Sequence, residues 1–115
     1  RTVMATAKPE KFAKRIAELF DFAKYFEFIG GACMDGRRTD KYDVIEYVLD
    51  SCGISEEEKK DAVMIGDRSH DMIGAAKAGL HSLGVLYGYG SREELASAGA
   101  AMTAETPGDI CSIIL

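Results

Sequence analysis

Short apolar runs alternate with helix-like segments along the whole chain, and this alternation restricts the fold more than any other feature. The apolar runs occupy residues 2–6, 25–29, 62–65, 81–86 and 101–104. Segments with helical apolar spacing lie between and after them, joined by short connections. Strands that alternate with helices in this way form parallel sheets with crossover helices. We therefore expect an α/β fold with helices on both faces of a parallel sheet.

The helical segments have recognisable stripes and ends. After Pro9, an apolar stripe of Phe12, Ile16, Leu19 and Phe20 has the spacing of a helix that packs on a core. Gly30 and Gly31 are predicted to end the second strand. The second helix is predicted to carry an apolar stripe of Val44, Ile45, Val48 and Leu49 and to end at Gly53, and the third to span 70–78 before Gly79. The fourth is predicted to begin at a Ser91–Glu94 capping box and to end at Gly99. The fifth is predicted to begin at Pro107, with Ile110, Ile113, Ile114 and Leu115 as its apolar residues.

Composition sets wide limits on function. With 115 residues, of which 47% are hydrophobic, the chain fits one domain with a packed core. The net charge of -5 argues against a nucleic-acid partner, because phosphate backbones are bound by clustered Lys and Arg. No run reaches the roughly 20 apolar residues of a membrane span, so we expect no membrane partner. Cys33, Cys52 and Cys111 are predicted to be small buried side chains in a reducing cytoplasm.

The segment from Gly66 to Asp71 carries the strongest chemical signal. Gly66 follows an apolar run and would let the chain turn sharply, Asp67 lies at the strand tip, and Asp71 comes about one helical turn later. This spacing lets both carboxylates approach one point. Two hard oxygen ligands suit Mg²⁺, which takes one or two carboxylates together with phosphate oxygens and waters. The alternative is that Asp67 only caps the helix while Asp71 faces water.

Two further polar residues belong to the same pattern. Thr6 ends the first apolar run, where its hydroxyl and the N–H groups of the next turn could hold an anionic oxygen, although Thr also often caps helices. Lys41 stands near a helix start, where the dipole disfavours a cation, so it either reaches a phosphate or is solvated surface. Arg37 and Arg38 make the preceding loop basic and could steer an anion. Because parallel sheets bind ligands at the carboxyl ends of strands, we expect Thr6, Lys41 and Asp67 to meet at one sheet edge.

Taken in order, these motifs resemble the haloacid dehalogenase (HAD) superfamily, and within it the phosphoglycolate-phosphatase-like members. The resemblance is carried by VMATAKP (3–9), GGACMDGRRTDK (30–41), VMIGDRSHDMIGAAKAG (63–79) and LGVLYGYG (83–90). It spans nearly the whole chain. It implies a HAD-like Rossmannoid sheet and a Mg²⁺-dependent enzyme that hydrolyses a small phosphorylated metabolite.

The resemblance also implies a role for each matching residue. In the family, an Asp on the central strand attacks the phosphate, and water cleaves the resulting aspartyl-phosphate. Thr6 would hydrogen-bond the transferring phosphoryl group, and Lys41 would neutralise the charge of phosphate and nucleophile. Asp67 would bind Mg²⁺, and Asp71 would bind it directly or through water. Thr6, Lys41 and Asp67 are thus the implied catalytic residues.

One part of the family pattern is absent from the chain. The nucleophile motif Asp-x-Asp-Gly-Thr does not occur; Asp35-Gly36 is its nearest match, lacks the leading Asp and is predicted to be a loop turn. The family's cap domain is missing too. We therefore expect residues 1–115 to be the C-terminal part of a HAD-like core domain, whose central nucleophile strand and cap belong to the remainder of a longer polypeptide. The isolated chain is expected to show no turnover.

Other protein classes fit less well. A phospho-accepting receiver domain uses similar residues, but its acidic residues precede the Thr and its Lys comes last, whereas the order here is Thr6, Lys41, Asp67. The glycines at 88–91 are too short a pattern for a nucleotide-binding loop. A catalytically inactive relative that binds phosphorylated ligands stays open, because the nucleophile is not in the chain.

Overall fold

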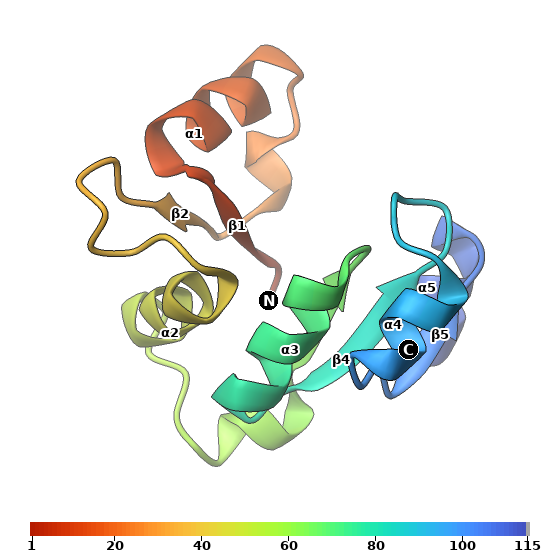
Figure 1. Cartoon of the computed structure of the whole chain (residues 1–115). Helices are drawn as coiled ribbons and strands as arrows, with labels where there is room; N and C mark the ends of the chain where they lie inside the picture. Colours follow the sequence, from red (N-terminus) through yellow and green to blue (C-terminus); the bar gives the residue numbers. More distant parts are fainter. Residues whose placement is uncertain (115) are drawn as a thin grey trace. The chain divides into compact units, whose positions relative to one another are not determined.

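The computed structural model describes residues 1–114, which form two parallel β-sheets, one of two strands and one of three, and five α-helices. Figure 1 shows these elements. The predicted α/β class is confirmed. The chain divides into two compact units, Arg1–Ser55 (unit 1) and Glu56–Leu115 (unit 2), and each is described by itself. The expectation that they form one domain stays a prediction.

Unit 1 is a two-stranded parallel sheet with a helix on each face. Its elements are β1 (Val3–Pro9), α1 (Glu10–Leu19), β2 (Phe28–Ala32) and α2 (Lys41–Ser51). Ile29 of β2 packs with Ala13 and Ala17 of α1. The next residue, Gly30, lies against Val48 of α2. Because successive strand residues point to opposite faces, the two helices cover the two sides of this sheet, as predicted.

The second strand begins and ends later than the sequence indicates. A 3₁₀ turn at Ala23–Tyr25 precedes it, so the prediction of a strand at 25–29 that ends at the glycines is wrong. Gly30 and Gly31 instead lie buried within β2. A Cβ on Gly31 would lie 2.6 Å from the Cα of Glu10. These glycines therefore permit close approach of neighbouring elements and do not form a turn.

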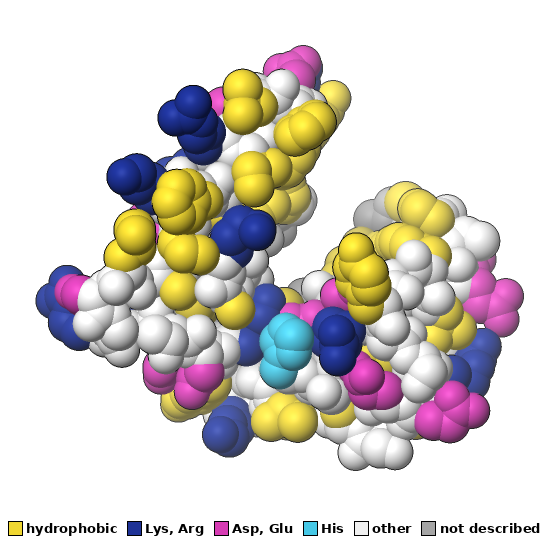
Figure 2. Space-filling model, turned by 45° about the horizontal axis from the view of Figure 1, so that its top comes forward, with side chains coloured by type: hydrophobic (Ala, Val, Ile, Leu, Met, Phe, Trp, Pro, Cys, Tyr) yellow, Lys and Arg dark blue, Asp and Glu magenta, His cyan; other side chains and the backbone are white. Residues whose placement is uncertain are grey.

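The apolar stripe predicted for the first helix is not its buried face. Ala13 and Ala17 of α1 are 5% and 0% exposed, whereas Phe12, Leu19 and Phe20 are 44%, 69% and 73% exposed. The small side chains let α1 lie close to the sheet, and the bulky ones cannot enter that narrow contact. Hydrophobic side chains accordingly gather on the surface of the part of unit 1 that carries α1 (Figure 2).

Unit 2 is a three-stranded parallel sheet in the order β3-β4-β5. On one face, Leu83 and Ala104 pack with Ile110 of the last helix. On the other face, Gly84 lies against Leu95. The elements lie close to their predicted positions: β3 (Val63–Gly66), α3 (Ser69–Ala78), β4 (His81–Val85), α4 (Arg92–Ser97), β5 (Met102–Ala104) and α5 (Pro107–Ile114), preceded by a 3₁₀ turn at Glu58–Asp61. The prediction for Leu115 lies outside the described residues.

Helix ends also follow the sequence. Gly53 and Gly79 come after α2 and α3 with φ of +67° and +82°, a left-handed conformation that glycine adopts without strain. The Ser91 side chain accepts a hydrogen bond from the Glu94 N–H at 3.1 Å. The predicted helix ends at Gly53 and Gly79 and the N-cap role of Ser91 are therefore confirmed.

Four strands have an unpaired edge among residues 1–114. β1 and β2 pair only with each other, and β3 and β5 pair only with β4. In β3 the side chain of Ile65 is 38% exposed. An edge of this kind presents backbone N–H and C=O groups that another strand can bind.

Two expectations from composition can be compared with side-chain exposure and helix length. Cys33 and Cys52 are partly buried, but Cys111 is exposed on α5, so the prediction of a buried thiol is wrong there. None of the helices in residues 1–114 has both the length and the apolar character that crossing a membrane requires.

Candidate functional site

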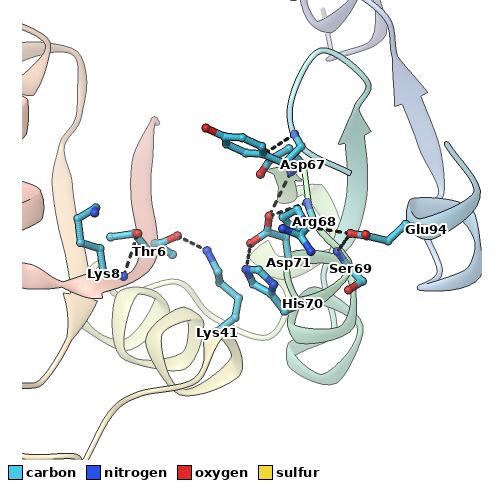
Figure 3. Close-up of polar contacts among 11 residues, drawn as sticks. Thr6, Lys8, Lys41, Asp67, Arg68, Ser69, His70, Asp71 and Glu94 are labelled. Carbon is cyan, nitrogen blue, oxygen red and sulfur yellow. Dashed lines mark hydrogen bonds and ion pairs between the residues drawn. The ribbon is translucent and has the colours of Figure 1, made fainter. Parts of the chain in front are cut away.

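In unit 1, the side chain of Lys41 reaches the part of β1 that contains Thr6 (Figure 3). Lys41 is the first residue of α2, and its Nζ donates to the carbonyl oxygen of Ala5, the neighbour of Thr6, at 2.9 Å. Asp40 fixes the start of this helix by accepting from the Asp43 N–H at 2.8 Å. Two of the predicted site residues, far apart in sequence, are thus brought together within one unit.

Thr6 lies in an irregular part of β1 and does not end the strand as predicted. β1 continues to Pro9, and its register with β2 shifts between Ala5 and Pro9. The Thr6 Oγ1 accepts from the Lys8 N–H at 3.2 Å. One N–H group that was predicted to hold an anion is therefore used by Thr6 itself. Because the oxygen acts as acceptor there, the hydroxyl hydrogen can still be donated.

The basic loop between β2 and α2 is bound to the protein itself. Arg38 donates from Nε to the Gly31 carbonyl oxygen at 2.8 Å, and its guanidinium carbon lies 3.5 Å from the centre of the Tyr47 ring. Arg37 Nε lies 2.6 Å from Asp35 Oδ2, and the Arg37 N–H donates to Asp35 Oδ1. That backbone N–H is the main cause that lowers the pKa of the Asp35 carboxyl. Asp35 forms the predicted loop turn, and both guanidinium groups bind the protein.

In unit 2, Asp71 builds the turn between β3 and α3. Its Oδ2 accepts from the N–H groups of Asp67 and Arg68 at 3.1 and 3.2 Å, and the residue is only 4% exposed. A Cβ on Gly66 would collide with the Asp71 carboxylate, so Gly66 is needed here for its small size. The alternative in which Asp67 caps the helix while Asp71 faces water is therefore wrong, since Asp71 is the buried cap.

The same cap recurs at the start of α5. Asp109 Oδ2 accepts from the N–H groups of Glu105 and Thr106 at 3.2 and 3.1 Å. As with Asp71, the donors lie four and three residues before the carboxylate. This turn follows β5 in a segment that carries none of the predicted site residues, so the arrangement is sufficient to build a turn without any metal.

Asp67 is held by the loop that follows β4. Its Oδ2 accepts from the Tyr89 N–H at 3.0 Å, and its carbonyl oxygen accepts from the Gly90 N–H at 2.8 Å. A Cβ on Gly88 would collide with the Asp67 side chain, and one on Gly90 with the Asp67 carbonyl oxygen. Among residues 1–114, no hydrogen bond is made to Asp67 Oδ1. In the sequence these glycines were too short a pattern for a nucleotide-binding loop; the two glycines flanking Tyr89 were the available signal.

Glu94 is a second residue whose contacts the sequence did not indicate. Its Oε2 accepts from the Ser69 N–H at 2.8 Å and from Arg68 Nε at 3.0 Å (Figure 3). The Ser69 N–H, followed by the Arg68 guanidinium, lowers the pKa of Glu94 below its ordinary value of 4.5. The capping box predicted with Ser91 is therefore half formed, because the Glu94 carboxylate turns to the start of α3.

Replacing Glu94 with Gln should reduce stability at neutral pH and leave it little changed in acid. A lowered pKa in the folded state gives stability that is present above the unfolded-state pKa and is lost as pH falls through the folded-state value. The urea midpoints of wild type and Glu94→Gln should therefore differ near pH 7 and converge towards about pH 3. Glu93→Gln, the same change one residue earlier, is the control. A difference that stays constant over this range would contradict the prediction.

Asp67 and Asp71 offer a donor set that fits Mg²⁺. Both are hard oxygen ligands at the carboxyl end of β3, and Asp67 is a partly exposed residue. Within residues 1–114, no three His, Cys, Asp or Glu side chains gather as a metal site. Further ligands would have to be waters, phosphate oxygens or groups outside these residues. The two pairs, Thr6 with Lys41 and Asp67 with Asp71, lie in different units, and their meeting at one edge stays a prediction.

The parallel strands and the polar residues that follow them define a Rossmann-like α/β chain of the HAD type. The sequence profile of the HAD-hydrolase-like family matches residues 40–111. The chain belongs to this family. This membership confirms the resemblance found in the sequence.

Relatives from other organisms are similar over most of the chain. A 5′-nucleotidase from Pseudomonas aeruginosa is 46% identical over 92 residues, which are 80% of this chain and 40% of the relative. The tyrosine-protein kinase PtkA from Mycobacterium tuberculosis is 42% identical over 90 residues, 78% of this chain and 30% of the kinase. The crystal structure of a predicted phosphatase from Clostridium acetobutylicum is 45% identical with a TM-score of 0.91, over 97% of this chain and 50% of the other. Phosphoglycolate phosphatases from Vibrio species also match.

These relatives are longer than the chain and differ in activity. The chain spans less than half the length of the nucleotidase and of the kinase. The relatives named here include a 5′-nucleotidase, phosphoglycolate phosphatases and a tyrosine-protein kinase. Family and fold are therefore fixed, whereas the reaction and its substrate need an argument of their own.

Proposed function

We propose that the protein is a Mg²⁺-dependent phosphatase that hydrolyses a small phosphomonoester through an aspartyl-phosphate. The observation that carries this proposal is the 2.9 Å contact from Lys41 Nζ to the Ala5 carbonyl oxygen, because it puts an ammonium beside Thr6. Membership of the HAD-hydrolase-like family supports the same chemistry. The nucleophilic Asp would come from a strand outside residues 1–115, and β1 and β3 each have an unpaired edge that such a strand could use.

Each residue of the chain would then have a defined task. The Asp oxygen attacks phosphorus while the bond to the leaving alcohol breaks, and water then cleaves the acyl phosphate to release inorganic phosphate. The Thr6 hydroxyl donates to a phosphoryl oxygen, and the Lys41 ammonium neutralises charge on the phosphate and the nucleophile. Asp67 would hold Mg²⁺, and Asp71, which already caps the turn, would hold it directly or through a water. Charge neutralisation at the phosphoryl group is the chemistry that the bound ion supplies.

The proposal extends to substrate and compartment. A small phosphorylated metabolite is the substrate class, and 5′-nucleotides and phosphoglycolate are the first compounds to test because relatives carry those names. A cytoplasmic location fits three widely spaced cysteines without a disulfide. The net charge of -5 disfavours a nucleic acid as the substrate.

A comparison of two proteins tests the proposed function. The full-length protein should release phosphate from at least one member of a panel of nucleoside 5′-monophosphates, phosphoglycolate and p-nitrophenyl phosphate, with Mg²⁺ present and not with EDTA. The isolated residues 1–115 should release none, because they contain no nucleophile motif. Turnover by the isolated chain, or EDTA-resistant turnover by the full-length protein, would overturn the mechanism. Transfer of labelled phosphate from ATP to tyrosine, without phosphatase activity, would assign the protein to the activity named for its mycobacterial relative.

A further inference from the structure

The loop after β4 contacts Asp67, the residue proposed to hold Mg²⁺, through three consecutive residues. They contact the Asp67 side chain and the Asp67 carbonyl group. Gly88 lies against the side chain of Asp67, the Tyr89 N–H donates to its Oδ2 at 3.0 Å, and the Gly90 N–H donates to its carbonyl oxygen at 2.8 Å. We call residues 88–90 the Asp67 clamp. Both its hydrogen bonds come from backbone groups, so its geometry is set by the main chain.

The clamp and Asp67 meet because their strands are neighbours. β3 and β4 are parallel and pair in register, with Gly66 opposite Gly84, so the segments that follow them emerge at the same sheet edge. Space at this edge is tight: a Cβ on Gly88 would lie 2.5 Å from Asp67 Oδ2. Only a residue without a side chain leaves the Asp67 carboxylate in its present position.

The clamp also gives the two carboxylate oxygens different roles. Oδ2 of Asp67 is bound by the Tyr89 N–H, while Oδ1 accepts no hydrogen bond within the part of the chain that the structure describes. A carboxylate fixed through one oxygen presents the other in one orientation, and mutation of groups that orient a metal ligand costs about 10- to 100-fold in metal affinity. The clamp thus supplies what a metal-binding carboxylate needs and what a turn alone does not.

We propose that Gly88, Tyr89 and Gly90 are positioning residues that orient Asp67 so that its Oδ1 is presented to Mg²⁺. This inference rests on the proposed function, since it assumes that Asp67 is a metal ligand. It assigns the work to the main chain and to the absence of side chains at positions 88 and 90. The exposed Tyr89 side chain, 91% accessible, is not needed for it.

The test compares glycine substitutions in the full-length protein. Gly88→Ala and Gly90→Ala should raise the Mg²⁺ dissociation constant, measured by calorimetry, by about 10- to 100-fold. Gly108→Ala is the matched control, because a Cβ there would meet nothing closer than 3.7 Å. Tyr89→Ala keeps the backbone N–H and should bind Mg²⁺ like the wild type. Folded Gly88→Ala and Gly90→Ala variants with wild-type Mg²⁺ affinity would overturn the inference.

A measurement on the unaltered protein covers the case in which the glycine variants do not fold. With ¹⁵N-labelled tyrosine and glycine, the Tyr89 amide resonance should shift with added Mg²⁺ along the calorimetric binding curve, while the Gly108 amide stays in place. A Tyr89 amide that ignores bound Mg²⁺ would overturn the inference. If the wild type neither binds Mg²⁺ nor turns over phosphomonoesters, it is the proposed function that fails. The two failures are therefore distinguishable.

Discussion

Replacing Asp67 with Asn in the full-length protein should lower phosphatase kcat/KM on the order of 100-fold or more and weaken Mg²⁺ binding to a similar degree. Asn has nearly the same shape as Asp, and its carbonyl oxygen can still accept from the Tyr89 N–H that now binds Asp67 Oδ2. The turn and the clamp should therefore persist. What is lost is the negative charge that a hard divalent cation requires.

Two controls separate this charge effect from damage to the fold. Asp109→Asn removes a carboxylate that caps the start of α5 as Asp71 caps the turn before α3, and should leave kcat/KM and Mg²⁺ affinity unchanged. The thermal midpoint of Asp67→Asn should stay near that of the wild type in EDTA. Calorimetry and steady-state kinetics over a range of Mg²⁺ concentrations check both points. An Asp67→Asn enzyme with wild-type kinetics would remove Asp67 from the site.

Replacing Lys41 with Met should lower kcat by about 10²- to 10³-fold while leaving Mg²⁺ affinity nearly intact. The Nζ of Lys41 lies 2.9 Å from the Ala5 carbonyl oxygen, beside Thr6. In the proposed reaction this ammonium offsets the negative charge that builds up on the phosphate and the nucleophile. It therefore stabilises the transition state. Met keeps the length of the side chain and removes the charge. Single-turnover kinetics with metal at saturation measure the loss.

The expected Lys41→Met result is specific to the proposed role of Lys41, because kcat should fall while Mg²⁺ affinity stays nearly unchanged. Lys14→Met, a change of the same kind on α1, removes an exposed pair with Glu10 and should alter neither quantity. Lys41→Arg should restore little activity, because a planar guanidinium does not replace a compact ammonium at a fixed distance. If Lys41→Met and Asp67→Asn reduced Mg²⁺ affinity alike, the proposed division of tasks would be wrong.

The order of helices and strands was predicted well because hydrophobic periodicity and helix-ending residues such as glycine act over a few neighbouring positions. The apolar residues Val44, Ile45, Val48 and Leu49 recur at helical spacing, and all four are buried in α2. Prediction failed where packing against another element decides. Gly30 and Gly31 look like a turn in sequence, but β2 passes so close to α1 and α2 that any side chain there would clash. The apolar stripe predicted for α1 was wrong for the same reason. Ala13 and Ala17 set the distance between this helix and the sheet, and the bulky side chains lie outside that contact.

The candidate site was predictable to the extent that motif residues stand near strand ends. Lys41 Nζ donates to the carbonyl oxygen of Ala5, the residue before Thr6, and Asp71 Oδ2 accepts from the Asp67 N–H. The meeting of these side chains at one sheet edge stays a prediction. The clamp and the contacts of Glu94 with Arg68 and Ser69 were not predicted, because they involve backbone groups and residues more than 20 positions away in sequence. Such contacts leave only glycines and a single acidic residue as traces in the sequence. They are seen in the structure, where neighbouring strands pair in register and bring the loops that follow them together.

The cap formed by Asp71 has a consequence for reading related sequences. The carboxylate that closes the turn after β3 satisfies two backbone N–H groups whether or not chemistry follows, just as Asp109 does elsewhere in the chain. A lineage that abandoned catalysis would still be under pressure to keep an oxygen acceptor at position 71 in order to fold. Retention of this acid in a homologue therefore reflects the fold, and under the proposed mechanism activity is judged from Asp67 and Lys41.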